Sequence, residues 1–207
     1  YAAANVKACS QALDLHELEK VVTVLTRART VYVLGFGLSS QLAAMLALHL
    51  QPFCQHVIEV AGQGGTEIAA GHLANITSKD VLLVISFPRY SLDVIRLAGF
   101  AAEREATIVS ITDSPASALA KVATHVLYAQ STHPILPSSN SAAIAVIEAL
   151  VVTLMVSNKG NVEKAARLTE SISAWLYGSD SDFNSNTDGA RRSPTSRPKK
   201  QLIKPQE

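Results

Sequence analysis

The sequence predicts an α/β fold in which a five-stranded parallel sheet lies between two layers of helices, as a three-layer αβα sandwich. Short β-branched runs alternate with longer segments of helical periodicity, which is the pattern of strands joined by crossover helices. The run from Val81 to Ile85 is apolar on both faces, as a strand inside a parallel sheet must be. The chain has 207 residues, of which 48% are hydrophobic, and this is enough for one buried core.

Five strands and six following helices are expected. The strands are predicted at residues 31–36, 57–61, 81–86, 107–112 and 126–130. The helices are predicted at residues 39–50, 66–73, 91–103, 116–121, 138–157 and 162–177. Before the first strand, apolar residues recur at helical spacing, which predicts one leading helix or a pair of helices that ends near residues 27–30.

Charge and composition divide the chain into three parts: residues 1–30 as the lead-in, 31–177 as the α/β domain, and 178–207 as a disordered basic tail. Residues 184–207 carry six basic and two acidic side chains, which leaves twelve basic and fifteen acidic residues before them. This mildly acidic remainder argues against a broad nucleic-acid surface on the folded domain. The tail has too few apolar residues to fold, and it is interpreted as a solubilising segment, with nucleic-acid binding as the alternative.

The cellular setting is predicted from the cysteines and the apolar runs. Only Cys9 and Cys54 are present, so reduced thiols in the cytoplasm are expected rather than a disulfide framework. Charged residues, His or Gly interrupt the apolar runs before a membrane-spanning length is reached, and no membrane partner is expected. The chain starts at Tyr1 in an amphipathic helix, so we expect that a preceding segment is missing.

The first candidate site is the turn that runs from Gly35 to Ser40, directly into a helix. Glycines permit a tight turn, and free N–H groups at a helix N-terminus bind anions; the hydroxyls of Ser39 and Ser40 stand beside them. A dinucleotide fingerprint is the alternative, because Glu59 lies near the expected place of a ribose-binding acid. However, Ser40 replaces the third glycine of that fingerprint, and no cofactor is expected.

The second candidate turn follows the third strand, from Ser86 to Ser91. Ser91 stands at an N-cap position and Pro88 suits a turn, so the segment also has a purely structural interpretation. Alternatively, Ser86, Arg89 and Ser91 supply hydroxyl and guanidinium donors opposite the glycine turn. Such donors, together with helix N-terminal amides, suit a phosphate monoester.

The third region is the loop at residues 134–141, which leads into an apolar helix with a single acid, Glu148. An ionised Glu is costly to bury without a partner, so Glu148 is expected either to reach a polar cavity, a cation or another subunit, or to be exposed. Glu67 and His72 follow a glycine-rich loop, and either could approach a sugar. Surface placement is favoured for His72. No metal site is expected.

These turns together resemble the SIS (sugar isomerase) domain of phosphosugar isomerases and phosphosugar-binding regulators, over about residues 5 to 177. Within it, residues 18–30, 31–40 and 75–80 most resemble the RpiR/MurR family of bacterial transcription regulators, which carry an N-terminal helix-turn-helix domain. The resemblance implies the flavodoxin-like SIS fold. It also implies that Ser39, Ser40, Ser86 and Ser91 are phosphate-binding hydroxyls, that Gly37 belongs to the same turn, that Glu67 contacts the sugar, and that Glu148 is the sugar-facing helix acid.

The second turn departs from the family pattern Ser-x-Ser-Gly-x-Thr. Here Pro88 and Arg89 occupy the places of the second serine and the glycine. One hydroxyl and the flexible glycine are therefore lost. Arg89 is expected to compensate with a stronger, charge-assisted phosphate contact.

Three functions follow from the resemblance. The first is a sensor, the effector domain of a transcriptional regulator, in which a sugar phosphate controls the arrangement of a homodimer or tetramer and DNA is bound only through a missing N-terminal domain. The second is a phosphosugar isomerase, which needs a carboxylate base; the visible candidates are Glu67, His72, His133 and Glu148. The third is a dimerisation module. The sensor is favoured, and no catalytic residue is assigned.

Overall fold

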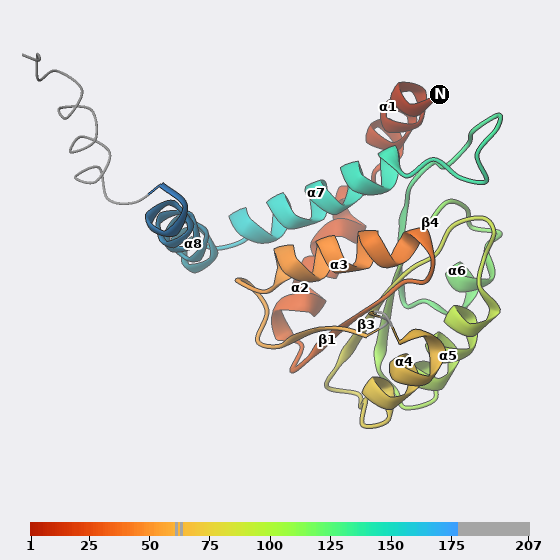
Figure 1. The fold of residues 1–207 in the computed structure, drawn as a ribbon, viewed down its shortest axis with the longest axis horizontal. Coiled ribbons are helices and arrows are strands. Elements are labelled where there is room, and N and C mark those ends of the chain that lie inside the picture. The colour runs from red at the N-terminus through yellow and green to blue at the C-terminus, as the bar shows by residue number, and fades with distance from the viewer. Residues whose placement is uncertain (61, 63, 178–207) are drawn as a thin grey trace, which may run out of the picture. The chain divides into compact units, whose positions relative to one another are not determined.

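The computed structural model describes residues 1–60, 62 and 64–177. The chain divides into two compact units, Tyr1–Ala166 and Arg167–Glu207. The first unit holds the whole sheet and helices α1 to α7 (Figure 1). The tail predicted at residues 178–207 lies outside the described residues, as does Ala61 at the end of the second predicted strand.

The sheet is parallel throughout, which confirms the predicted fold class. Its strands are β1 (Val31–Leu34), β2 (Val57–Glu59), β3 (Val81–Ile85), β4 (Thr107–Thr112) and β5 (His125–Tyr128). They lie in the order β2-β1-β3-β4-β5, with every neighbouring pair parallel. The chain moves from β1 to one side and then returns to the other side of β1 with β3. The order of the strands therefore reverses between β1 and β3, and ligands of doubly wound sheets bind at such a switch point.

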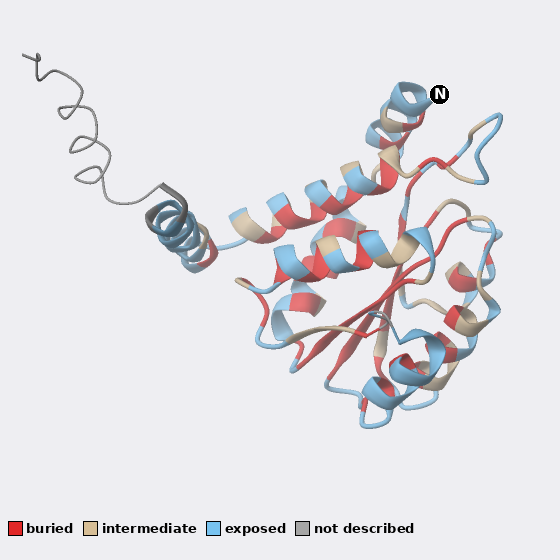
Figure 2. Ribbon diagram, viewed as in Figure 1, coloured by how far each residue is buried: buried red, intermediate tan, exposed pale blue. Residues whose placement is uncertain are grey.

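Helices cover both faces of the sheet (Figures 1 and 2). One face is covered by α1 (Ala2–Ala12), α2 (Leu15–Arg27), α3 (Leu38–Leu50) and α7 (Ser141–Val156). The other is covered by α4 (Gly65–Leu73), α5 (Leu92–Ala102) and α6 (Ala118–Val122). A further helix, α8 (Lys159–Tyr177), begins in the first unit. The predicted lead-in is therefore a pair of helices.

The inner strand β3 explains why its sequence is apolar without alternation. Leu82 and Val84 face the α4 to α6 layer, while Val81, Leu83 and Ile85 face the α3 and α7 layer. All five side chains are buried, and each removes apolar surface from water, which is the main favourable contribution to folding. Strand β4 has its predicted bounds, whereas β1 and β3 end earlier than predicted because Gly35, Phe36 and Ser86 leave the sheet to form the turns of the site.

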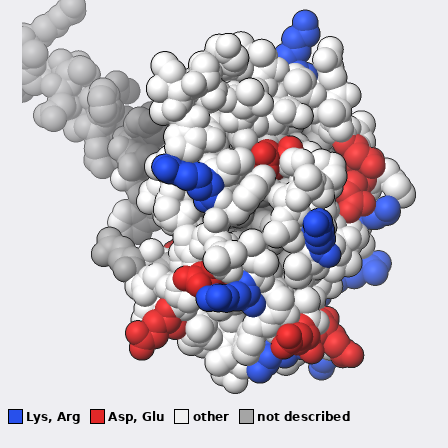
Figure 3. Space-filling view, turned by 90° about the vertical axis from the view of Figure 1, so that its right-hand side faces the viewer, with Lys and Arg blue, Asp and Glu red and all other residues white. Residues whose placement is uncertain are grey.

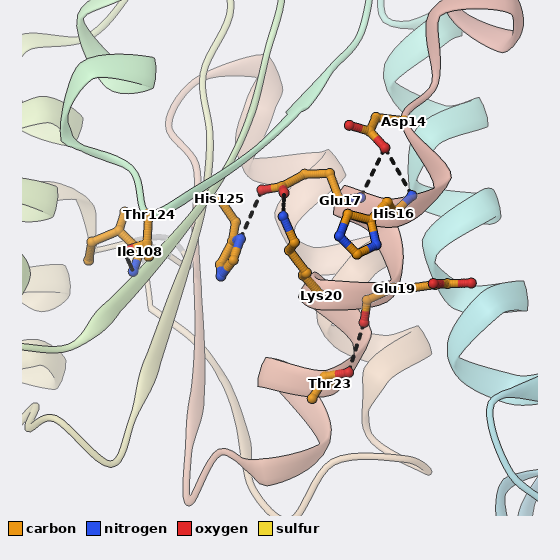
Figure 4. Close-up of polar contacts among 9 residues, drawn as sticks. All are labelled: Asp14, His16, Glu17, Glu19, Lys20, Thr23, Ile108, Thr124 and His125. Carbon is orange, nitrogen blue, oxygen red and sulfur yellow. Dashed lines mark hydrogen bonds and ion pairs between the residues drawn. The ribbon is translucent and has the colours of Figure 1, made fainter.

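Helix α2 is held at the β5 edge by polar contacts (Figure 4). The Asp14 carboxylate caps α2 by accepting from the N–H groups of His16 and Glu17. His125 Nδ1 on β5 lies 2.8 Å from Glu17 Oε1, and Lys20 Nζ lies 3.3 Å from Glu17 Oε2. Burial alone would raise the pKa of Glu17, but the contacts with His125 and Lys20 hold it below its ordinary value.

An ion pair fixes the start of β1 to the start of β3. Arg29 Nε donates to Asp80 Oδ1 at 2.9 Å, and Asp80 Oδ2 accepts from both the N–H and the hydroxyl of Thr77 at 2.9 Å. The side chain of Asp80 is fully buried, while that of Arg29 is 48% exposed. Both oxygens of the Asp80 carboxylate accept hydrogen bonds in this arrangement. These bonds compensate the cost of burying its charge.

Charged residues on the face shown in Figure 3 lie in scattered groups. Lys, Arg, Asp and Glu are all present there, and they form no continuous basic area on this face.

Among the described residues, no single helix has both the length and the apolar composition needed to span a membrane. Helices α7 and α8, the latter up to Ser173, meet these criteria only when taken together, and the pair is bent.

Candidate functional site

A pocket of about 180 Å³ opens at the carboxyl ends of β1 and β3, beside the switch point of the sheet. Three loops meet there: the turn after β1, the turn after β3, and the loop between β5 and α7. The lining residues are Phe36, Gly37, Leu38, Ser39, Ser86, Phe87, Pro88, Arg89, Ser91, Val94, Pro137, Ser138 and Asn140. The location is where the fold class predicts a ligand.

The turn after β1 needs glycine at two positions. At Gly35, an added Cβ would lie 2.3 Å from the carbonyl oxygen of Ser39, so only glycine lets the following helix fold back so closely. Gly37 has a φ of 59°, a left-handed conformation that glycine adopts at little cost. The two glycines therefore set the path along which the chain enters α3.

The same turn separates the two predicted serine donors. The Ser40 hydroxyl donates to the carbonyl oxygen of Gly37 at 2.7 Å, and Ser40 does not line the pocket. Ser39 does line it, and its hydroxyl forms no hydrogen bond with a described residue. The N–H groups of Ser39 and Ser40 are used within the turn, while those of Gly37 and Leu38 have no acceptor among the described residues. The structure thus places Ser39, but not Ser40, at the pocket.

The turn after β3 supplies the second wall, where Ser86, Arg89 and Ser91 all line the pocket. Ser91 is the N-cap residue of α5, but its side chain makes no capping hydrogen bond. The purely structural interpretation of Ser91 therefore loses its usual physical basis. Arg89 is exposed and forms no ion pair with any described acid, so its guanidinium remains available to a ligand.

A hydrogen bond beside Arg89 holds this turn against the end of β4. The Tyr90 hydroxyl donates to Asp113 Oδ1 at 2.6 Å. Burial, the hydrogen bond to Asp113 and the charge of Asp113 together raise the pKa of Tyr90 to about 12, so the phenol remains a donor across the physiological range. The turn is therefore positioned from outside the pocket.

The loop between β5 and α7 supplies the third wall through Pro137, Ser138 and Asn140. The N–H of Ser139 donates to the carbonyl oxygen of Ser131 at 2.8 Å, which closes the base of the loop. The predicted helix starting at residue 138 begins instead at Ser141, because residues 138–140 belong to this loop. The sequence indicates this loop as a candidate region but predicts no ligand residue within it; Ser and Asn residues directly ahead of a helix are the signal that marks them.

Three helix N-termini meet at the pocket, those of α3, α5 and α7. Gly37, Ser91 and Asn140 are their N-cap residues, and each lines the pocket. The partial positive charge of each N-terminus favours an anion. Arg89 is the one formally charged residue among those lining the pocket. An anionic ligand with several acceptor oxygens fits this arrangement.

The two predicted acids lie outside the pocket. Glu67 is exposed on α4, and Glu148 is exposed on the outer face of α7. Neither His72 nor His133 lines the pocket, and His133 Nδ1 accepts from the N–H groups of Ile135 and Leu136 at 3.1 and 2.8 Å. Within the described ranges, no group of three or more His, Cys, Asp or Glu side chains could hold a metal ion.

The pocket lies at the switch point of an open parallel sheet and suits an anionic ligand, and the fold can now be compared with known families. The family model of the SIS domain matches residues 24–153, and the chain belongs to this family. The resemblance inferred from the three turns is therefore confirmed.

Curated relatives of the chain include transcriptional regulators. The chain is 24% identical over 151 residues to an uncharacterised HTH-type transcriptional regulator, YbbH, of Bacillus subtilis (strain 168). This match covers 70% of this chain and 50% of that protein. It is 32% identical over 115 residues to an uncharacterised HTH-type transcriptional regulator of Haemophilus influenzae, covering 56% of this chain and 39% of that protein. The chain thus spans half or less of the length of these relatives.

Solved structures of other proteins share the fold. The sugar isomerase domain of the RpiR transcription factor from Sphaerobacter thermophilus superposes with a TM-score of 0.73 at 26% identity, covering 83% of this chain and 93% of that chain. The Vibrio vulnificus NanR protein, solved in complex with ManNAc-6P, gives a TM-score of 0.75 at 22% identity, covering 85% of this chain and 67% of that chain.

Proposed function

We propose that this chain is the phosphosugar-sensing effector domain of a bacterial transcriptional regulator. The observation that carries the proposal is the pocket at the switch point, where three helix N-termini, the free hydroxyls of Ser39 and Ser91 and the cation of Arg89 meet without any carboxylate. Such a set binds a phosphate monoester. It offers no acid to act as a base, so it suits binding better than proton transfer.

The ligand proposed for this pocket is a sugar phosphate whose phosphate group lies inside the pocket. Small-molecule sites usually enclose about 300–1,000 Å³, and this pocket encloses about 180 Å³. The pocket is therefore proposed to hold the phosphate group and the adjoining part of the sugar, while the rest of the sugar projects outward. ManNAc-6P, with which the structurally similar NanR protein was solved, is a suitable first probe.

A second copy of the chain is proposed to cover the outer face of α3 and α7. Helix α3 contains no Asp, Glu, Lys or Arg and α7 contains one, Glu148, while Leu48 and Val152 are 66% and 56% exposed on the outside. Exposed apolar faces of this kind mark protein interfaces. Leu38 belongs both to this face and to the pocket, so a partner on the face would lie beside the ligand and respond to it.

The proposal includes a DNA-binding domain joined ahead of α1 in the complete protein. Its support is that the curated relatives are HTH-type regulators and that the present chain spans half or less of their length. On this proposal, ligand binding changes the arrangement of two effector domains, and the change is passed to DNA through the attached domain.

Arg89→Ala is expected to weaken binding of ManNAc-6P by about 10- to 100-fold, because a hydrogen bond to a charged group contributes about 1.5–3 kcal/mol. Isothermal titration with ManNAc-6P and with unphosphorylated ManNAc measures this effect. Lys121→Ala removes an exposed cation on α6 and should leave binding unchanged. Equal losses for both sugars would remove Arg89 from the phosphate site.

If neither ManNAc-6P nor a panel of hexose and pentose phosphates bound the wild-type chain, the sensor proposal would fall.

A phosphosugar isomerase is the alternative function, since the domain family includes such enzymes and the exposed Glu67 and Glu148 are carboxylates that a second subunit could bring to a ligand. Deuterium incorporation from solvent at the carbon beside the sugar carbonyl decides between them: exchange at that carbon would establish catalysis.

Leu48→Glu is expected to convert a dimer into a monomer, because it places a charge on the desolvated face of the proposed contact. Size-exclusion chromatography with light scattering measures the mass. Leu15→Glu is the matched control, since Leu15 is also 66% exposed but lies on α2, away from the α3 and α7 face. An unchanged dimer in Leu48→Glu would place the interface elsewhere.

A further inference from the structure

Helix α1 contacts the loop that forms the third wall of the pocket. Asn5 Nδ2 donates to the carbonyl oxygen of Thr132 at 2.8 Å, across a sequence separation of 127 residues. The Asn5 side chain is buried in this contact, with the residue 6% exposed. At the start of the same helix, the ring of Tyr1 lies 6.0 Å from the ring of His133, centroid to centroid.

The contacted segment leads directly to the pocket. Thr132 and His133 follow Ser131, whose carbonyl oxygen accepts the N–H of Ser139 and closes the base of the loop. His133 fixes the loop from inside by accepting from two successive N–H groups. Beyond them, Ser138 and Asn140 line the pocket. A displacement of Thr132 therefore changes the wall that a ligand touches.

Helix α1 packs along α7, but few of its side chains are buried there. Its buried residues are Asn5 and Cys9, and only Val6 adds a partly buried apolar side chain near the core. Cys9 Sγ lies 3.4 Å from the carbonyl oxygen of Tyr128, at the end of β5. Segments with little buried apolar surface open at low free-energy cost, so small changes in the loop can alter how firmly α1 is held.

We propose that Asn5 is a positioning residue for the phosphate pocket, and that docking of α1 and occupation of the pocket are thermodynamically linked through the 131–140 loop. The ligand half of this inference rests on the proposed function. Linkage is reciprocal: if docked α1 favours the binding-competent loop, then bound ligand must favour docked α1 by the same factor. A DNA-binding domain joined ahead of α1 would then receive the ligand signal through this helix.

The reactivity of the Cys9 thiol reports whether α1 is docked. Burial raises the pKa of the Cys9 thiol, which suppresses its reactivity while α1 is docked. Cys54 is the other cysteine in the chain, and Cys54→Ala leaves Cys9 as the single thiol. In that background, the rate of Cys9 modification by DTNB measures how often α1 opens.

The first measurement is Cys9 labelling with and without saturating ManNAc-6P. We expect the ligand to slow labelling by about fivefold or more, since couplings between sites are typically about 5- to 150-fold. Inorganic phosphate serves as a second probe, because the third wall lies beside the anion site. A ligand that binds by titration but leaves the Cys9 rate unchanged would overturn the linkage.

The second measurement compares Asn5→Ala with Ser10→Ala in the same background. Asn5→Ala should weaken ManNAc-6P binding by about three- to tenfold, the effect of one lost hydrogen bond, and should speed Cys9 labelling. Ser10 lies on the exposed side of α1 and bonds only within the helix, to the carbonyl oxygen of Lys7, so Ser10→Ala should change neither. Unchanged affinity in a folded Asn5→Ala variant would show that Asn5 is merely structural.

A third measurement needs no ligand and separates this inference from the proposed function. Hydrogen exchange of the amides in residues 131–140 should be faster in Asn5→Ala than in wild type, while exchange in β3 stays the same. If no sugar phosphate binds, the proposed function fails, but hydrogen exchange still tests whether Asn5 positions the loop. Equal exchange of the loop in both proteins would overturn the positioning role of Asn5.

Discussion

Replacing Gly35 by alanine is expected to lower the free energy of unfolding by about 2–3 kcal/mol and to abolish binding of sugar phosphates, because overpacking a tight contact costs about 1–3 kcal/mol and here displaces the site itself. An added Cβ would lie 2.3 Å from the carbonyl oxygen and 2.7 Å from the carbonyl carbon of Ser39. Both are backbone atoms, so the start of α3 must shift. Urea unfolding and titration with ManNAc-6P measure the two effects.

Gly71→Ala is the matched control for Gly35→Ala. Gly71 lies within α4, where an added Cβ would meet no atom within 4 Å. Alanine there should stabilise the chain by about 0.5–1 kcal/mol, since it favours the helix and restricts the unfolded chain. Wild-type binding in a folded Gly35→Ala variant would contradict the assignment of the first turn to the site.

Asp80→Asn is expected to lower the free energy of unfolding at pH 7 by about 2–3 kcal/mol, because hydrogen bonds to a charged group contribute about 1.5–3 kcal/mol. The variant weakens the bond from Arg29 and the bonds from Thr77 to a fully buried side chain. Glu103→Gln neutralises an exposed acid and should have little effect. Ligand binding should persist in Asp80→Asn, because the ion pair lies at the amino ends of the strands.

The effect of Asp80→Asn should disappear in acid. Burial alone would raise the pKa of Asp80, but the Arg29 guanidinium and the two donors of Thr77 hold it below its ordinary value, which is about 3.9. A depressed folded pKa stabilises the protein fully above the unfolded pKa, and this contribution is lost as pH falls through the folded pKa. The two unfolding free energies should therefore begin to converge as pH falls below about 4, and should meet below the folded pKa of Asp80. A constant difference down to pH 2 would exclude this origin.

Much of the fold could be predicted from the sequence because it is encoded in local periodicity. The uninterrupted apolar run of β3 indicates a strand buried on both faces, and the helical spacing of Leu18, Val21 and Leu25 indicates α2. Each pattern requires only that neighbouring residues share a face. The parallel sheet and its two helical layers follow from the alternation of these segments. The local pattern does not mark the boundaries of the elements, since turn residues such as Phe36 and Ser138 have the composition of the adjoining elements.

The pocket was predictable in part. The first two turns could be selected because glycines and serines directly precede helices, and the structure places Gly37, Ser39, Ser86, Arg89 and Ser91 at one pocket. The sequence could not separate Ser39 from Ser40, since only the conformation of the turn directs the Ser40 hydroxyl to Gly37. Nor could it indicate that the exposed positions of Glu67 and Glu148 lie outside the pocket of this chain.

What the sequence by itself determined is the set of strands, helices and candidate turns between them, because each arises from residues adjacent along the chain. Only the tertiary structure decided which turns meet. Gly37, Ser91 and Asn140 lie about 50 residues apart in sequence, and they converge because the strand order reverses between β1 and β3 and because α7 packs beside α3. The contact of Asn5 with Thr132 has the same origin. Such contacts are set by the packing of whole elements, which no local pattern encodes.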